Sequence, residues 1–217
     1  GHGGSDPGAI GFGYKEKEIT LAIGKKLRTL LNNQGFQVVE SRGADVDVSL
    51  SARRSVAIKY NVDCIISIHH NAFSQDLANG VETWIRKNNT NRDMQLAEAI
   101  HKSIVKAKLF NVDRGIKKED FSLVTLQGIP SVLLELGFIT NDKDLRVIVQ
   151  KQDEIAVAIC KGVCNYLGMD YKAINQTPQE IKSDKLYRVQ VGAFSVKNNA
   201  EQLVKELKSK GYNAVIV

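Results

Sequence analysis

The sequence predicts an α/β protein: a three-layer sandwich with a largely parallel central sheet, followed by a small βαβ unit. Amphipathic helical stretches alternate with short apolar runs over residues 1–167. A polar stretch without apolar periodicity, 168–184, then breaks this pattern and is interpreted as a linker. Residues 185–217 resume it with one more strand, helix and strand. The sequence therefore predicts two domains joined by a linker.

The helices of the first domain are predicted from apolar residues that recur at helical spacing. In 17–33 these include Ile19, Ile23 and Leu27. Further helices are expected at 49–60, with Ser49 or Ser51 as the cap, at 92–108, and over a helical region from 141 to about 167. Short apolar runs predict strands at 36–40, 63–68, 81–86, 121–126 and 131–135.

The C-terminal unit is expected to contain a strand at 186–192, a helix at 198–210 and a strand at 212–217. Gly211 would end the helix. So short a unit seldom buries enough apolar surface to be stable alone. We therefore expect the chain to be cut short at its C-terminus, or this unit to pair with another copy.

The composition is that of a soluble globular protein, with 43% hydrophobic and 25% charged residues among 217. No apolar run approaches the roughly 18 residues that span a bilayer. The three cysteines, Cys64, Cys160 and Cys164, form neither a disulfide framework nor a zinc motif, and are interpreted as buried thiols.

The formal net charge of +6 favours a polyanionic partner. No nucleic-acid recognition motif with interleaved aromatic residues is present, so nucleic acid is not expected. The alternative, that the excess lysines only solvate helices, stays open.

Four scattered segments contain the residues best suited to chemistry. They supply imidazoles from His2 and His69 and carboxylates from Glu16 and Glu135. His2 lies in a glycine-rich stretch, while His69 and Glu135 follow apolar runs that read as buried strands. Two histidines and one carboxylate suit a catalytic zinc site with an open position for water, and the remaining carboxylate suits a general base. This pattern predicts a hydrolase.

Seven segments in order resemble the zinc-dependent N-acetylmuramoyl-L-alanine amidases of the type-3 amidase family, from residue 1 to about 167. They are GHGGSDPGAIG at 1–11, EKEITLAI from 16, SLSARR at 49–54, SIHHNAF at 67–73, GVETWI at 80–85, RGIK at 114–117 and IPSVLLELGFITN at 129–141. The resemblance implies that His2, Glu16 and His69 bind Zn²⁺ and that Glu135 is the catalytic carboxylate.

Neighbouring residues leave alternatives open. Glu18 is a second candidate for the acidic ligand, but the family motif aligns on Glu16, and the two side chains point about 200° apart on a helix. His70 adjoins His69 and is expected to face solvent or the rim of the cleft. Arg53 and Arg54 could pair with a structural carboxylate or contact substrate.

The resemblance also implies a strand ahead of the Gly-His-Gly-Gly turn. Because the chain begins at Gly1, we expect that strand to be missing and the sequence to be a fragment or a trimmed form.

The tail resembles one βαβ repeat of the SPOR domain, a peptidoglycan-binding module. The resemblance lies in YRVQVGAFS at 187–195, NAEQLVKEL at 199–207 and GYNAVIV at 211–217. It implies peptidoglycan as a partner and denuded glycan strands as a candidate ligand of 185–217. The alternative is a small structural appendage without a ligand.

Together the resemblances imply a peptidoglycan hydrolase, extracellular or in the cell wall, that cleaves the amide between N-acetylmuramic acid and L-alanine. The role would be autolysin-like wall remodelling or lysis. The expected domains are 1–167 (catalytic), 168–184 (linker) and 185–217 (wall-binding). A zinc peptidase or deacetylase with the same four groups is the rival enzyme. A non-catalytic wall-binding module is the rival of another class, although such a module would not need Glu135.

Overall fold

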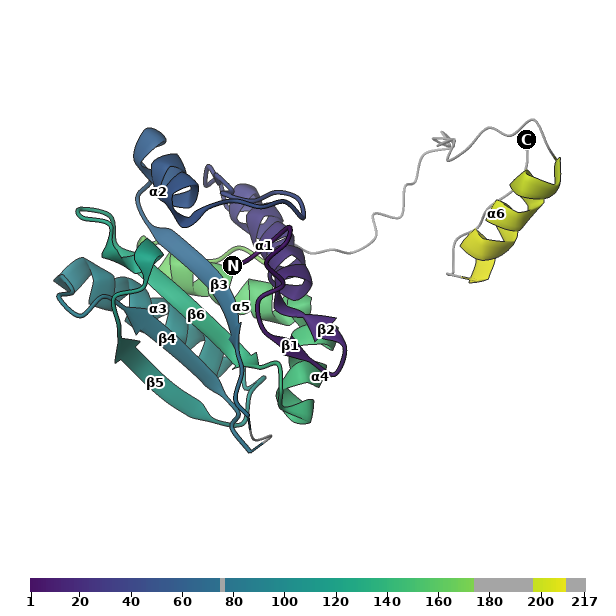
Figure 1. Ribbon diagram of the computed structural model, residues 1–217. Coiled ribbons are helices and arrows are strands. Elements are labelled where there is room, and N and C mark those ends of the chain that lie inside the picture. Colours follow the sequence, from purple (N-terminus) through teal and green to yellow (C-terminus); the bar gives the residue numbers. More distant parts are fainter. Residues whose placement is uncertain (75–76, 174–196, 210–217) are drawn as a thin grey trace. The chain divides into compact units, whose positions relative to one another are not determined.

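The computed structural model describes residues 1–74, 77–173 and 197–209 (Figure 1). The chain divides into two compact units, Gly1–Ile174 and Asn175–Val217. In the second unit the structure describes helix α6 (Lys197–Ser209), where the sequence predicts a helix. The strands predicted at 186–192 and 212–217 lie outside the described residues.

The first unit is built on a four-stranded sheet in the order β3 (Ile65–Asn71), β6 (Ser131–Phe138), β4 (Val81–Ile85) and β5 (Asp113–Lys118). The pairs β3–β6 and β4–β5 are parallel, and β4–β6 is antiparallel. The predicted class, α/β with a largely parallel central sheet, is confirmed.

Three helices form the main apolar layer: α1 (Glu16–Asn33), α3 (Asn91–Lys106) and α5 (Gln152–Tyr166). Helix α5 packs against both α1 and α3, and α3 also contacts β4 and β6. Figure 1 shows α3 and α5 behind the sheet. Side chains from helices and strands meet in one core, whose fully buried members include Ile23, Ile85, Leu96, Ile100, Leu134 and Ile159.

The remaining elements are short. A hairpin of β1 (Ile10–Gly11) and β2 (Tyr14–Lys15) leads into α1. Helix α2 (Leu50–Lys59) begins at the predicted cap, where the Ser49 side chain accepts from Ala52 N at 3.1 Å. Helix α4 (Asp142–Gln150) follows β6. No helix in the described part of the chain is long and apolar enough to cross a membrane.

Two predicted strands are wrong. Residues 36–40 form no strand, because β3 is an edge of the sheet and no strand among the described residues pairs with this segment. A cavity of about 450 Å³ is lined by α1, this segment and β3. The other error, 121–126, contains the 3₁₀-helix η1 (Ser122–Thr125), in which Thr125 Oγ1 donates to Ser122 O at 3.0 Å.

Two other features differ from the prediction: one helical region is divided, and one strand was not predicted. The helical region from 141 is two helices, α4 and α5, that meet at Lys151. Strand β5 was not predicted, because its sequence, Asp-Arg-Gly-Ile-Lys-Lys, has one apolar residue. An edge strand needs little apolar surface, and its charges discourage pairing with other chains.

Candidate active site

The Gly-His-Gly-Gly loop turns sharply and brings His2 to the sheet. His2 itself has a positive φ of 51°, and Gly4 and Gly8 have φ values of 59° and 66°. Two buried arginine side chains hold the loop in place through hydrogen bonds to its backbone carbonyl groups. Arg53 Nη2 donates to His2 O at 2.7 Å, and Arg42 Nη2 donates to Gly1 O at 3.0 Å. Arg53 therefore holds backbone carbonyl groups, which is neither the pairing with a structural carboxylate nor the substrate contact that the sequence left open.

Glu16 is the first residue of α1, and its carboxylate is almost fully buried. Ala9 N donates to Oε2 at 2.8 Å, and His70 N donates to Oε1 at 3.1 Å. Backbone groups thus fix this carboxylate between the N-terminal loop and β3. Glu18, the alternative acid, is exposed.

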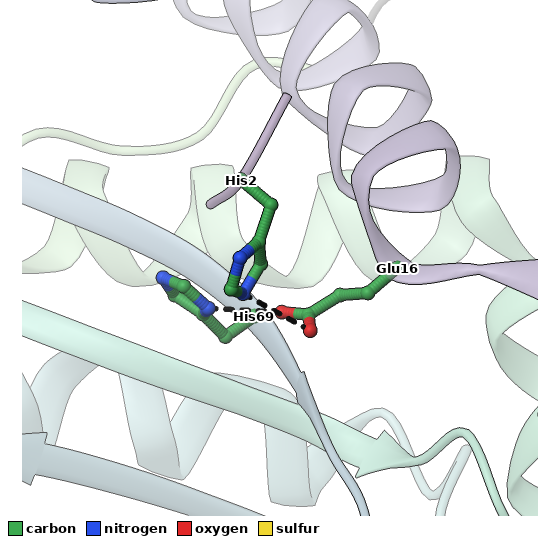
Figure 2. A group of neighbouring side chains, drawn as sticks. All are labelled: His2, Glu16 and His69. Atoms are coloured by element: carbon green, nitrogen blue, oxygen red, sulfur yellow. Dashed lines mark hydrogen bonds and ion pairs between the residues drawn. The ribbon is translucent and has the colours of Figure 1, made fainter. Parts of the chain in front are cut away.

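The structure brings His2, Glu16 and His69 together (Figure 2). His2 Nε2 lies 3.1 Å from Glu16 Oε2, and His69 Nδ1 lies 2.9 Å from Glu16 Oε1. One ligand atom from each residue lies within 4.8 Å of the others, and the two rings meet edge to face at 5.0 Å. Three donors from a loop, a helix and a strand therefore converge on one point.

The charges of this group are strongly coupled. Burial raises the pKa of Glu16, but the hydrogen bonds from His2 and His69 outweigh it and hold that pKa far below its usual range. Burial lowers the pKa of His69 to about 4, so this imidazole is neutral at neutral pH. The Glu16 carboxylate raises the pKa of His2.

The donor set fits a zinc ion. Neutral imidazole nitrogens and a carboxylate oxygen are the ligands that Zn²⁺ takes in catalytic sites. Asp6 Oδ2 lies 2.7 Å from His2 Nδ1, which orients the ring and directs Nε2 toward Glu16. This role of Asp6 was not predicted, although its spacing from His2 within one glycine-rich turn is a usable signal.

Glu135 lies beside this group, on β6. It is paired in register with His69 of β3 and with Glu82 of β4, so the three side chains share one face of the sheet. Burial, followed by the charges of Glu16 and Glu82, raises the pKa of Glu135 to about 8. Its Oε2 is buried and has no hydrogen-bond partner in the described residues. This carboxyl group is therefore poised to exchange a proton with a ligand or with water.

His70 was expected to face solvent or the rim of the cleft. That prediction is wrong, because the His70 side chain is buried on the face of the sheet opposite to His69. His70 Nδ1 lies 2.8 Å from Leu136 O. Arg54 does not reach the group either, because its Nη1 donates to Ser122 O and, at 3.0 Å, to Thr125 Oγ1.

A second polar cluster, centred on Glu82, adjoins Glu135 and was not predicted from the sequence. Glu82, almost fully buried, accepts from Arg114 Nε, from Lys117 Nζ at 2.7 Å and from Trp84 Nε1 at 3.0 Å. The sequence signal was a lone acid in an otherwise uncharged strand.

The sequence and the fold were compared with known proteins. The family model for N-acetylmuramoyl-L-alanine amidase (Amidase_3) matches residues 1–165, and the model for the SPOR domain matches 167–217. The sporulation-specific N-acetylmuramoyl-L-alanine amidase of Bacillus subtilis (strain 168) is 33% identical over 219 residues, covering 100% of this chain and 82% of the relative.

Solved structures of N-acetylmuramoyl-L-alanine amidases are also similar to the first unit of this chain. An N-acetylmuramoyl-L-alanine amidase from Clostridium difficile 630 has a TM-score of 0.74 at 36% identity, covering 77% of this chain and 93% of its own. The catalytic domain of CwlV, an amidase from Bacillus (Paenibacillus) polymyxa var. colistinus, has a TM-score of 0.73 at 30% identity, covering 78% and 96%. Because the amidase model matches residues 1–165, which is most of the chain, and the SPOR model matches residues 167–217, this chain belongs to the Amidase_3 family of N-acetylmuramoyl-L-alanine amidases and carries a SPOR domain.

Proposed function

We propose that this protein is a zinc-dependent amidase that hydrolyses the bond between the lactyl group of N-acetylmuramic acid and the L-alanine of the stem peptide. The supporting observation is the convergence of His2, Glu16 and His69 beside the unpaired carboxyl group of Glu135. The metal would be held by His2 Nε2, a Glu16 oxygen and His69 Nδ1. Bound there, zinc supplies Lewis-acid chemistry, polarising the scissile carbonyl and lowering the pKa of a bound water.

Glu135 is proposed to move the protons of the reaction. It takes a proton from the attacking water and later gives it to the departing amine of L-alanine. The buried surroundings that raise its pKa favour delivery of that proton near neutral pH. Glu16 differs, because it accepts from the backbone N–H groups of Ala9 and His70, and these hydrogen bonds favour its ionised form. The two carboxyl groups therefore suit different roles, ligand and base.

The wider role is proposed to be autolysin-like remodelling or lysis of the wall, with the protein extracellular or in the cell wall. The SPOR domain would hold the enzyme on peptidoglycan, with denuded glycan strands as the proposed ligand.

Analysis of the products from purified peptidoglycan tests the bond specificity. Mass spectrometry should find free stem peptides with an L-alanine amino terminus, and glycan strands with unsubstituted lactyl groups. The Glu135→Gln variant serves as the matched blank. Cleavage within the stem peptide would favour the rival zinc peptidase, and release of acetate would favour the deacetylase. No product at all would favour the non-catalytic wall-binding module.

A further inference from the structure

A row of charged side chains crosses the sheet face that holds Glu135. The register places His69, Glu135 and Glu82 side by side on β3, β6 and β4. The row continues onto β5, where Arg114 and Lys117 both donate to Glu82 Oε1. The candidate metal group therefore lies at one end of this row and two cations lie at the other, with Glu135 between them.

Glu82 anchors the cations but does not use up their hydrogen-bonding capacity. Arg114 donates to it through Nε, which leaves the Nη1 and Nη2 fork without a partner in the described part of the chain. The guanidinium lies over the Phe138 ring, with Cζ 5.1 Å from the centroid. About a third of the side chain, 34%, is exposed. Arg114 is thus held in place from two sides while its fork stays open.

The charges of the cluster favour an anion at this fork. Glu82 cancels one of the two positive charges, so the cluster keeps one net positive charge beside Glu135. Burial raises the pKa of Glu82, but the hydrogen bonds from Lys117 and Arg114 outweigh it and keep this group ionised. A planar fork with two parallel N–H donors matches a carboxylate, which it can bind through two hydrogen bonds.

We propose that Arg114 is a specificity residue that binds a carboxylate on the peptide side of the substrate, with Glu82 as its positioning residue. The inference rests on the amidase function proposed above. The fork lies two strands away from Glu135 and three from His69, on the same face of the sheet, so a bound peptide chain can reach it from the scissile bond. The carboxylate of the residue that follows L-alanine is the substrate group of suitable chemistry.

Two soluble muramoyl peptides provide the test. They differ only in whether the residue after L-alanine carries a free carboxylate or the corresponding amide. The wild-type enzyme should prefer the carboxylate form by roughly tenfold to a hundredfold in kcat/KM, as expected for hydrogen bonds to a charged group. In Arg114→Gln that preference should fall to near unity, chiefly through KM. Arg114→Lys, which keeps the charge but loses the fork, should retain only part of it.

Lys118→Gln is the matched control. Lys118 is exposed on the same strand and, as the neighbour of Lys117, points to the opposite face of the sheet. The same charge is lost, so an unchanged preference there ties the effect to the fork rather than to net charge. Glu82→Gln should weaken the preference without abolishing it.

Several results would overturn the inference. A wild-type enzyme that cleaves both peptides equally well would overturn it while leaving the amidase function intact. An Arg114→Gln variant with a lowered melting temperature and an intact preference would show that Arg114 is structural. If that variant lost activity only on sacculi that carry phosphate polymers, the bound anion would be phosphate and not the peptide carboxylate. Cleavage of neither peptide would overturn the proposed function and this inference with it.

Discussion

His69 and Glu135 are paired in register on the neighbouring parallel strands β3 and β6. Side chains paired in this way project from the same face of a sheet. The imidazole proposed to bind metal and the carboxyl group proposed to act on water are thus spaced by the strand separation. Neither residue depends on a long loop for its position, so the two should keep their relative geometry when substrate binds.

The identity of the acidic ligand can be tested with two substitutions on one helix. Glu16→Gln removes the carboxylate that both histidines contact, so bound zinc should fall from one ion per chain to nearly none. Glu18→Gln removes an exposed carboxylate from the same turn of α1 and should leave zinc content unchanged. Metal analysis after gel filtration measures both. Full zinc occupancy in Glu16→Gln would show that the ligand set is wrong.

Glu135→Gln keeps the shape of the side chain and removes the base. The loss of one general acid or base typically lowers the rate by a hundredfold to ten-thousandfold. We therefore expect kcat to fall by about that factor, while zinc content and binding to sacculi stay at the wild-type level. Near-native turnover in this variant would rule out the role proposed for Glu135.

Gly8 is packed against the group and tolerates no side chain. A Cβ there would lie 2.5 Å from His2 Cδ2 and 2.6 Å from Glu16 Oε2. Gly8→Ala should therefore displace both ligands and weaken zinc binding by roughly tenfold to a hundredfold, as other disturbances around a metal site do. Calorimetric titration with zinc measures this loss.

Gly13→Ala separates that clash from backbone strain. Gly13 also has a positive φ, 84°, but a Cβ there would meet nothing within 4 Å. The Gly13→Ala variant should therefore lose some stability, because of the backbone strain, and keep its zinc affinity. Equal losses of affinity in the two variants would contradict the packing argument.

The buried pair of Arg86 and Asp93 should make stability depend on pH. Arg86 Nη2 donates to Asp93 Oδ2 at 2.8 Å, and Thr90 donates to the same oxygen through its backbone and hydroxyl groups at 2.7 Å. Burial raises the pKa of Asp93, but these hydrogen bonds outweigh it and hold the pKa below its usual range. The stabilisation is therefore present above the unfolded-state pKa of about 3.9 and is lost as pH falls through the folded-state value.

Asp93→Asn should accordingly cost about 3–5 kcal/mol of unfolding free energy at neutral pH, because it leaves Arg86 buried without its counter-charge. The gap between variant and wild type should narrow as pH falls below about 4. Chemical denaturation across this pH range measures both effects. A gap that stays constant down to low pH would show that the charge on Asp93 does not matter.

The fold class could be predicted because the core elements have strong patterns. Helix α1 shows apolar residues at helical spacing, and β6 is a largely apolar run that Glu135 interrupts. Strand β5 could not be predicted, since an edge strand carries charges in place of a buried face. Residues 36–40 have strand-like composition, but a strand forms only where a partner completes its hydrogen bonds.

The same distinction holds for the site. Chemically unusual positions, such as His2 among glycines, could be found from the sequence. The orientation of His70 was mistaken, because its expected place at the cleft rim ignored the strand alternation that sends residues 69 and 70 to opposite faces. Glu82 and Arg114 were missed because only the pairing of β4 with β6 and β5 shows that they adjoin Glu135.

The contacts of Tyr171 and Lys172 decide where the tail can be removed. Gln34 exchanges two hydrogen bonds with Lys172, at 2.9 and 2.8 Å, and Tyr171 packs against the core. A truncation after residue 174, which keeps the first compact unit whole, should therefore be more stable than one after Gly168. Thermal unfolding of the two forms measures the difference. Equal melting temperatures would show that residues 169–174 add nothing to the stability of this unit.

The truncation after residue 174 also separates catalysis from targeting. His2, Glu16, His69 and Glu135 all lie in the unit that remains, so zinc content and cleavage of soluble muropeptides should stay at the level of the whole chain. Binding to intact sacculi should fall, because the removed residues carry nearly all of the SPOR match. A sacculus pull-down, with Glu135→Gln in both forms to prevent digestion, compares them directly. Undiminished binding by the truncated form would place wall recognition on the catalytic unit and reduce the tail to a structural appendage.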